Sequence, residues 1–138
     1  MSPVAFNLTG VKKLHTEWSF HKFTDFSGHN LTEMKIGVLS DTHGWVDPAV
    51  YEHFKSVDEI WHAGDAGDID VITELEAFRP LRAVWGNCDD FEVRSATKAH
   101  LSFNAGGKKV LLMHIGGYPG HYDKHARELI SELKPDIF

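Results

Sequence analysis

The chain has 138 residues, of which 42% are hydrophobic, 12% aromatic and 25% charged, a composition typical of one globular domain that excludes collagen-like, disordered and coiled-coil proteins. Fourteen Lys and Arg against twenty Asp and Glu give a net charge of −6, so no nucleic-acid-binding surface is expected. The single cysteine cannot form an internal disulfide, and the apolar runs are too short for a membrane span or a secretory signal, which predicts a cytoplasmic protein without membrane contact.

Residues 1–33 form an electrically neutral segment that contains three lysines and three acidic residues. The four phenylalanines and Trp18 of this segment follow no sustained period of two or near 3.6 residues, so it is expected to be an N-terminal extension of the main domain. The segment is interpreted either as an extra edge element packed by its aromatic side chains or as an arm that the domain does not need. The lack of alternation favours the dispensable arm.

From Met34 onward, short apolar strands alternate with helices. A helix is predicted to open at Asp47 and Pro48, because aspartate caps a helix and proline fits its first position. A repeated strand–helix–strand pattern predicts parallel strands joined by right-handed crossovers. In chain order, strands are expected at residues 35–39, 59–62 and 81–85, with helices at about 47–55 and 69–78 between them.

The second half of the chain has a different pattern. Residues 100–104 and 109–113 flank a glycine turn and predict a β-hairpin. A glycine-rich stretch at residues 114–120 is expected to be an irregular loop, and a helix is expected over residues 123–133. Residues 137–138 have the pattern of the first step of one more strand.

Polar side chains follow four of the expected strands. In open α/β sheets, ligands bind at the carboxyl ends of the strands, so these side chains are candidates for one site. Carboxylate, amide and imidazole donors suit divalent Mn, Fe, Zn or Ni. Each residue alone is an ordinary turn or capping residue, but their order along the chain makes coincidence the minor interpretation. They are Asp41 and His43, Asp65, Asn87 and His114.

Four segments, residues 34–44, 60–65, 86–89 and 111–114, carry Asp-x-His, Gly-Asp, Gly-Asn-x-Asp and a strand-end His. In this order they resemble the calcineurin-like metallophosphoesterase superfamily, specifically its small single-domain phosphodiesterases. The resemblance covers residues 34–138 and implies an α/β fold, a metallophosphoesterase-type α/β/β/α sandwich with two mixed sheets.

The resemblance also implies the roles of the site residues. Asp41 and His43 would hold one metal ion, Asp65 would bridge two ions, and Asn87 and His114 would hold the second. The implied cofactors are two divalent ions, Mn²⁺ foremost, with Ni²⁺, Fe²⁺ or Zn²⁺ as alternatives. The implied reaction is hydrolysis of a small phosphodiester or phosphomonoester by a hydroxide that bridges the metals.

Two further residues adjoin this ligand set. The expected catalytic set consists of Asp65, Asn87 and Asp89. Asp89 has two interpretations. It is an acid that orients the Asn87 loop or one of the histidine ligands, or it is an exposed aspartate of a turn. Cys88 stands where larger members of the superfamily carry a histidine thought to protonate the leaving group. A thiol is a poorer proton donor, which predicts a preference for substrates with good leaving groups, although a small packed residue is the favoured interpretation of Cys88.

Four nearby side chains are assigned no role in metal binding. His62 and His121 are expected to be structural or exposed to solvent. Trp45 and Tyr118 could wall the site, but aromatic residues at strand ends are more often plain packing.

The closing Gly-His-x-His of the superfamily is absent from residues 34–138. With five of seven ligands, the chain resembles a truncated member whose fold is incomplete at the C-terminus, which predicts weakened metal binding and a slow or absent reaction. The alternative is an inactive scaffold of the same fold, as in the metallophosphoesterase-like subunit of retromer, although a scaffold has no need to keep all five ligands. A third hypothesis is a generic α/β domain without metal. The sequence indicates no oligomeric state.

Overall fold

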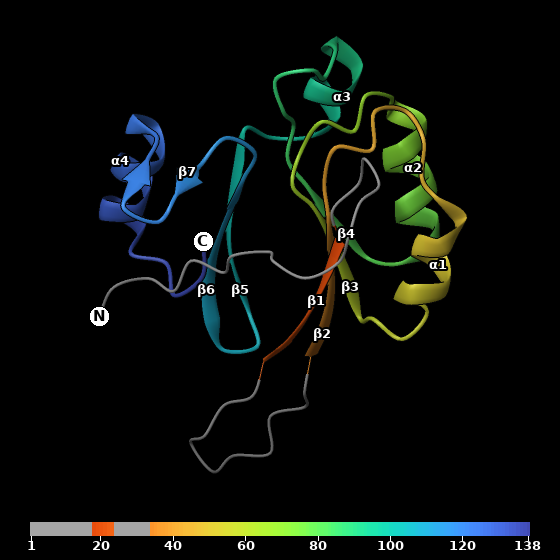
Figure 1. Cartoon of the computed structure of the whole chain (residues 1–138), viewed down its shortest axis with the longest axis horizontal. Helices are drawn as coiled ribbons and strands as arrows, with labels where there is room; N and C mark the ends of the chain where they lie inside the picture. Colours follow the sequence, from red (N-terminus) through yellow and green to blue (C-terminus); the bar gives the residue numbers. More distant parts are fainter. Residues whose placement is uncertain (1–17, 24–33) are drawn as a thin grey trace.

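The computed structural model describes residues 18–23 and 34–138. Two helices, α1 (Pro48–Phe54) and α2 (Ile69–Phe78), cover one face of a four-stranded sheet. The hairpin of β5 (His100–Ala105) and β6 (Lys108–Met113) lies against the other face, and α4 (Lys124–Leu133) lies beyond the hairpin (Figure 1). This arrangement confirms the α/β/β/α sandwich expected from the sequence.

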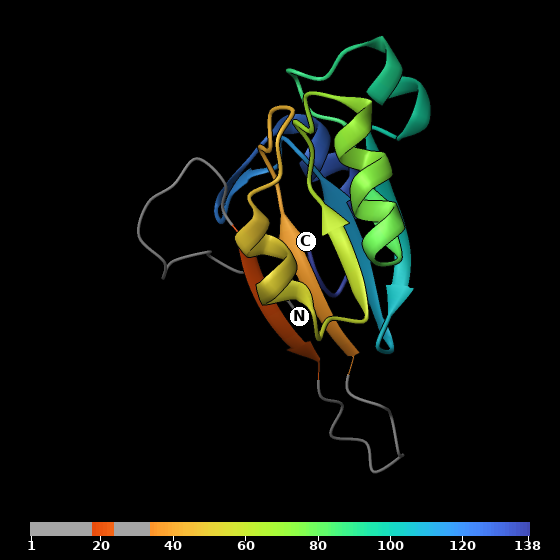
Figure 2. The same cartoon turned by 90° about the vertical axis from the view of Figure 1, so that its right-hand side faces the viewer.

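The first sheet is mixed and has the order β1-β2-β3-β4. Its strands β2 (Met34–Leu39), β3 (Glu59–His62) and β4 (Leu81–Ala83) run parallel, and β1 (Trp18–Phe23) pairs antiparallel with β2 at the edge. Figure 2 shows the parallel strands side by side with α1 and α2 in front of them. The registers of β2 with β3 and of β3 with β4 bring the carboxyl ends of the three parallel strands to one end of the sheet.

Within residues 1–33, strand β1 is an edge element, which is the less favoured of the two interpretations drawn from the sequence. Its six residues pair with the whole of β2, from Trp18 opposite Leu39 to Phe23 opposite Met34. The aromatic spacing gave no sign of a strand because an edge strand needs backbone pairing rather than strict alternation of apolar side chains. The rest of the extension, residues 1–17 and 24–33, lies outside the described residues.

The helices expected at about residues 47–55 and at 69–78 are confirmed as α1 and α2, and an aspartate caps the start of each. The side chain of Asp47 accepts a hydrogen bond from the backbone nitrogen of Ala49, and that of Asp68 accepts one from the backbone nitrogen of Asp70. Both caps satisfy an otherwise free N–H of the first helical turn. Within residues 18–23 and 34–138, no helix combines the length and apolar character required to cross a membrane.

The second sheet is centred on the β5–β6 hairpin, which matches the predicted hairpin. Ile137 pairs with β6 as well, because its backbone nitrogen donates to the carbonyl of Lys109 and its carbonyl accepts from the nitrogen of Leu111. The resulting isolated bridge is parallel, whereas β5 and β6 pair antiparallel. The expectation that residues 137–138 begin another strand is therefore supported.

Three short elements were not predicted. Helix α3 (Phe91–Ala96) has a single buried residue, Val93, which is too little for a recognisable apolar stripe. Strands β7 (Gly117–Tyr118) and β8 (His121–Tyr122) form a small antiparallel hairpin that begins inside the stretch expected to be an irregular loop, residues 114–120. The positive φ angles of Gly117 and Gly120 allow this tight reversal, so its glycines favour the hairpin.

Two apolar clusters fill the spaces between the layers. One lies between the first sheet and helices α1 and α2, and the other lies between the two sheets. Consecutive residues of β3, Ile60 and Trp61, belong to different clusters because successive strand residues face opposite sides of a sheet. At Gly37 a Cβ atom would lie 2.6 Å from the Phe54 ring, so α1 packs closely on β2 only because this residue has no side chain.

Candidate metal centre

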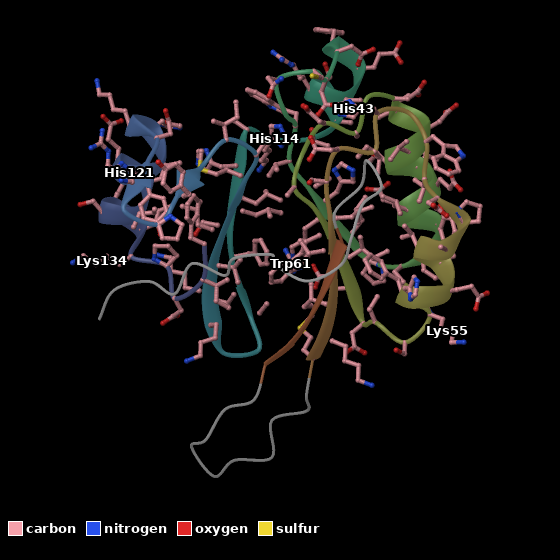
Figure 3. The ribbon with its side chains drawn as sticks, in the orientation of Figure 1. His43, Lys55, Trp61, His114, His121 and Lys134 are labelled. Carbon is pink, nitrogen blue, oxygen red and sulfur yellow. The ribbon has the colours of Figure 1, made fainter. Side chains whose placement is uncertain are left out.

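The five expected metal ligands meet at one end of the molecule. Asp41 and His43 follow β2, Asp65 follows β3, Asn87 follows β4 and His114 follows β6. Figure 3 shows His43 and His114 at the same end, opposite the end where Lys55 lies. The parallel register of β2, β3 and β4 explains why the ligands that follow these three strands lie at the same end of the sheet. The β5–β6 hairpin supplies the remaining ligand, His114.

Backbone hydrogen bonds tie the loop after β2 to the loop after β3. The nitrogen of Asp41 donates to the carbonyl of Gly64 at 3.0 Å, and that of His43 donates to the carbonyl of Asp65 at 3.1 Å. The nitrogen of Gly44 donates to the carbonyl of Ala66 at 2.7 Å. The two loops therefore act as one unit, and the positions of Asp41, His43 and Asp65 depend on one another.

These two loops hold their side chains in an unusual backbone conformation. Asp41, His43 and Asp65 have φ angles of 58°, 47° and 56°. Among the described residues, only one other residue that is not glycine, Lys134, has a positive φ. Such residues typically cost of order 1–3 kcal/mol and cluster at functional sites, where the surrounding structure holds them. The strain at three of the expected ligands supports a functional role for this end of the sheet.

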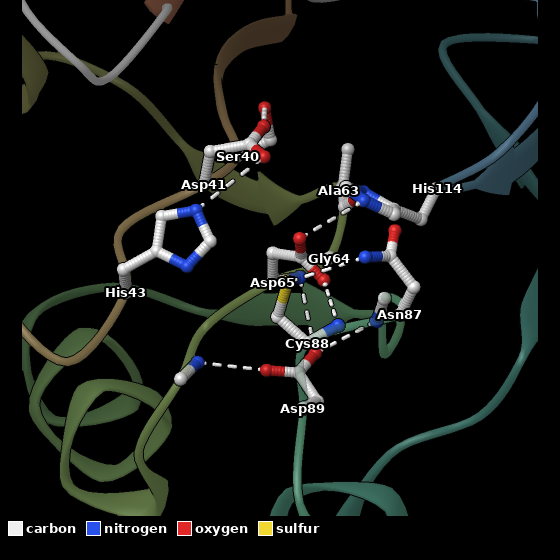
Figure 4. A network of polar contacts seen from close by, with 12 residues as sticks. Ser40, Asp41, His43, Ala63, Gly64, Asp65, Asn87, Cys88, Asp89 and His114 are labelled. Carbon is white, nitrogen blue, oxygen red and sulfur yellow. Dashed lines mark hydrogen bonds and ion pairs between the residues drawn. The ribbon is translucent and has the colours of Figure 1, made fainter.

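Asp65 lies at the centre of the site and is 3% exposed. Its Oδ1 accepts a hydrogen bond from the backbone nitrogen of Cys88 at 2.8 Å, and its Oδ2 lies 3.3 Å from Nε2 of His114 (Figure 4). Burial acts to raise the pKa of Asp65, but hydrogen bonds from Cys88 and the charges of His114 and His43 outweigh burial and hold the pKa below its ordinary value. The carboxylate is therefore ionised at neutral pH, as a metal ligand must be.

Asp89 is 4% exposed, so the interpretation of this residue as an exposed turn aspartate is wrong. Its Oδ2 accepts hydrogen bonds from the backbone nitrogens of Asp65, at 3.0 Å, and Gly86, at 2.7 Å. Its Oδ1 accepts one from the backbone nitrogen of Gly67, at 2.7 Å. One buried carboxylate thus joins the loop that carries Asp65 to the loop that carries Asn87.

Two glycines let the loops approach each other this closely. A Cβ atom on Gly86 would lie 2.0 Å from Oδ1 of Asp65, and one on Gly64 would lie 2.7 Å from the ring of His114. Distances below 3.0 Å to a Cβ cannot be accommodated without moving a neighbour. The glycines of Gly-Asp and Gly-Asn are therefore required for the site by their lack of a side chain.

Hydrogen bonding determines which nitrogen of His114 is available to a metal. Its Nδ1 lies 2.8 Å from the carbonyl oxygen of Ala63. A carbonyl can only accept, so Nδ1 carries the hydrogen, and Nε2, which lies beside Oδ2 of Asp65, is the nitrogen left to bind a metal. A metal-binding histidine typically donates its other N–H in this way, which fixes the ring orientation.

His62 is fully buried, and its two ring nitrogens contact Gly64 and Thr42, neither of which is a candidate metal ligand. Its Nδ1 accepts from the nitrogen of Gly64 at 3.2 Å, so Nε2 carries the hydrogen and donates to Oγ1 of Thr42 at 2.9 Å. Thr42 in turn donates to the carbonyl of Ala66 at 3.2 Å. Burial lowers the pKa of His62 to about 4, so the ring is neutral at pH 7. The structural role expected for His62 matches these contacts.

Two groups of side chains at this end place one ligand atom each within 4.8 Å of one another. One group consists of Asp41, Asp65 and His114, and the other of His43, Asp65 and Cys88. Asp65 is common to both, which fits the bridging role implied by the resemblance. The structure thus groups Asp41 with His114, whereas the resemblance implies that Asp41 and His43 hold the same ion. Nε2 of His43 nevertheless lies only 3.8 Å from Oδ1 of Asp41.

The side chains of Asn87 and Cys88 are both exposed, and Nδ2 of Asn87 donates to Sγ of Cys88 at 3.2 Å. The expectation that Cys88 is packed under a loop is therefore wrong. A hydrogen bond to the Asp65 carboxylate raises the pKa of the Cys88 thiol. Cys88 was not predicted as a candidate ligand, although its place between two expected site residues, Asn87 and Asp89, was the available signal.

The aromatic residues near the site do not form part of the core. Trp45 and Tyr118 are 61% and 63% exposed, so plain packing does not account for either side chain. His121 is exposed, in line with expectation, and the ring of Tyr118 lies 5.0 Å from its ring.

Comparison with known proteins agrees with the motifs. A family model described as "Calcineurin-like phosphoesterase superfamily domain" matches residues 34–137. A protein of Methanothermobacter thermautotrophicus named "Probable metallophosphoesterase" is 36% identical over 109 residues, which are 75% of this chain and 63% of that protein. A second archaeal relative of the same description, from Methanocaldococcus jannaschii, is 39% identical over 61 residues, 41% of this chain and 32% of that protein. The chain thus matches less than two thirds of the length of either relative.

Solved structures share the fold. Vps29 of Entamoeba histolytica superposes with a TM-score of 0.57 at 15% identity, over 73% of this chain and 59% of that one. A predicted phosphoesterase of Streptococcus pneumoniae superposes with a TM-score of 0.50 at 24% identity, over 71% and 56% of the two chains. At these identities the likeness concerns the fold alone. Together with the family match, which spans the whole site described above, it confirms the resemblance: the chain belongs to the calcineurin-like phosphoesterase superfamily.

Proposed function

We propose that this chain binds two divalent metal ions and hydrolyses phosphodiester bonds in small substrates, Mn²⁺ being the first metal to test. The superfamily is one of metal-dependent phosphoesterases, and the donors present here fit such ions. When bound, the metals would supply a Lewis acid for the phosphoryl oxygens and an activated water. The proposed ligands are those implied by the resemblance: Asp41, His43, Asp65, Asn87 and His114.

The observation that carries this proposal is the position of Asp65 in both groups of candidate ligand atoms. A carboxylate shared by two groups can bring two cations to about 3.5–4 Å, the separation of two-metal hydrolases. The lowered pKa of Asp65 keeps the shared oxygens charged. His114 offers a lone pair beside Asp65 because its other nitrogen donates to Ala63.

Asp89 is proposed as a positioning residue. Its carboxylate belongs to neither group of candidate ligand atoms, and it acts on Asp65 through the backbone. By accepting from three backbone nitrogens in two loops, it holds Asp65 and Asn87 at a fixed separation. Loss of Asp89 should therefore weaken metal binding and stability together.

The test is hydrolysis of bis(p-nitrophenyl) phosphate, an activated phosphodiester, with added Mn²⁺. We expect turnover that depends on the metal, and we expect Asp65→Ala to abolish it. His121→Ala, an exposed histidine in neither ligand group, is the control and should retain the rate. No difference between the unaltered chain and Asp65→Ala would count against the proposal.

A second candidate function is binding to another protein without catalysis. The observation that favours it is a set of large apolar side chains exposed shortly after the candidate ligands. Metal binding without any hydrolysis in the assay above would support this candidate. The side chains are Trp45, Phe91, Ile115 and Tyr118.

A further inference from the structure

We infer that Cys88 supplies a thiolate ligand to one of the two metal positions, together with His43 and Asp65. The inference rests on the proposed function, because it concerns the same metal centre, but it adds a ligand that the superfamily resemblance does not assign. It also predicts that this position prefers Zn²⁺ over Mn²⁺.

The geometry places Cys88 where a metal ligand would have to be. One nitrogen of His43, one carboxylate oxygen of Asp65 and Sγ of Cys88 all lie within 4.8 Å of one another. Metal bonds to nitrogen, oxygen and sulfur are about 2.0–2.3 Å long, so two ligands of one ion lie no more than about 4.6 Å apart. The three atoms therefore need only small side-chain movements to share an ion, and Figure 4 shows the sulfur beside the Asp65 carboxylate.

The backbone holds Cys88 at this place. Its nitrogen donates to Oδ1 of Asp65 at 2.8 Å, so the cysteine is anchored directly to the residue common to both ligand groups. Asp89, the next residue, is buried and accepts from three backbone nitrogens, which limits movement of the loop. The thiol itself is exposed and its sulfur contacts the amide of Asn87, so no core packing opposes its turning toward a metal.

The chemistry of the three donors decides which ion they favour. A thiolate is a soft ligand and an imidazole is borderline, and this combination suits Zn²⁺, whereas Mn²⁺ prefers oxygen donors. Binding forms a metal–sulfur bond and releases the thiol proton to water. The group of Asp41, Asp65 and His114 contains two carboxylates and has no sulfur, so the two positions differ in their preference.

The experiment uses Co²⁺ as a spectroscopic substitute for Zn²⁺, because cobalt bound to thiolate gives a charge-transfer band in the near ultraviolet. Cys88 is the only cysteine of the sequence, so such a band has a single possible source. We expect the band to grow during titration of the full chain with Co²⁺. It should be absent in Cys88→Ser, whose Zn²⁺ dissociation constant should rise at least tenfold, while the constant for Mn²⁺ changes less than threefold.

Two variants sharpen the test. His43→Ala should lower the affinity for Co²⁺ because it removes the imidazole of the same group. His121 is an exposed histidine in neither group, so His121→Ala should leave the Co²⁺ affinity unchanged. Calorimetry shows independently whether Co²⁺ binds. Cobalt binding without a charge-transfer band, or equal Zn²⁺ affinity in Cys88→Ser, would overturn the role of Cys88 while leaving the proposed phosphodiesterase intact; absence of all metal binding would overturn both.

Discussion

Oδ2 of Asp89 accepts a hydrogen bond from the backbone nitrogen of Asp65 at 3.0 Å, across 24 positions of the chain. The same oxygen also accepts from the nitrogen of Gly86, so the turn that begins Gly-Asn and the turn of Gly-Asp share one buried acceptor. This contact explains why the aspartate at position 89 belongs to the motif although it is not among the proposed ligands. The site depends on the loops being held together as much as on the ligands themselves.

Asp89→Ala should therefore destabilise the protein strongly. The substitution removes the acceptor of three backbone N–H groups in a buried environment, and hydrogen bonds to a charged group contribute about 1.5–3 kcal/mol each, so a loss of about 3 kcal/mol or more in the free energy of unfolding is expected. Urea denaturation measures it. The neighbouring Asp90, which is exposed and caps α3, is the matched control, and Asp90→Ala should cost about 1 kcal/mol. Equal losses in the two variants would remove the special role of Asp89.

Acid should destabilise the protein through His62 before it affects the carboxylates. The pKa of His62 falls from 6.5 to about 4 on folding, because burial disfavours the charged ring. Below pH 6.5 the unfolded chain therefore binds more protons at His62 than the folded chain does. The folding stability that the neutral ring preserves is complete above pH 6.5 and is lost as the pH falls toward 4. From the size of the shift we expect a loss of about 2 kcal/mol at pH 5.

Denaturation at pH 7 and pH 5 checks this expectation, and NMR titration of the ring gives its pKa directly. The lowered pKa of Asp65 acts in a lower window, below its ordinary value of 3.8, so the two effects are separable. A His62 ring that titrates near pH 6.5 in the folded protein would show that the contacts with Thr42 and Gly64 do not hold it neutral.

Gly86→Ala should disrupt the metal centre by a steric effect alone. The added Cβ would lie 2.0 Å from Oδ1 of Asp65 and 2.6 Å from its backbone nitrogen, so the carboxylate or the loop must move. We expect Mn²⁺ affinity to fall at least tenfold, since changes that misplace metal ligands typically cost 10–100-fold. Gly107→Ala is the control. Gly107 lies in the β5–β6 turn, and a Cβ atom added there would have no neighbouring atom within 4 Å, so the substitution should leave metal affinity unchanged despite the positive φ of this residue.

Removal of residues 1–33 should lower stability, which reverses the expectation drawn from the sequence. The shortened chain loses β1 and exposes the backbone edge of β2 along its full length. We expect a fall of about 3 °C or more in Tm, the effect of about 1 kcal/mol in a domain of this size, and increased aggregation. Removal of residues 1–17 alone keeps β1 and should have a smaller effect. Equal Tm values for the full chain and the chain that begins at Met34 would show that β1 contributes nothing.

The parts of the fold that the sequence predicts are those in which local pattern and burial agree. Strand β3 is buried at all four positions and α2 presents Val71, Ile72 and Leu75 to the core, so both were predicted with the observed bounds. Helix α3 was not predicted because only Val93 is buried. An edge element such as β1 was the less favoured of two interpretations because pairing at a sheet edge leaves little trace in the side-chain pattern.

In the candidate site, too, some features could be predicted from the sequence and others could not. The strand-end positions of Asp41, Asp65 and His114 follow from topology, so their proximity could be predicted. The burial of Asp89 and the exposure of Cys88 depend on how two loops meet, and sequence spacing does not contain that information.

Asp65 is proposed to join two metal positions, and this proposal can be examined by calorimetric titration with Mn²⁺. The unaltered chain should bind two ions. Asp65→Ala should lose both, since Asp65 is the one residue present in both ligand groups. Asp70→Ala, which removes an exposed carboxylate in the first turn of α2, should bind as the unaltered chain does. An unchanged titration for Asp65→Ala would contradict the account.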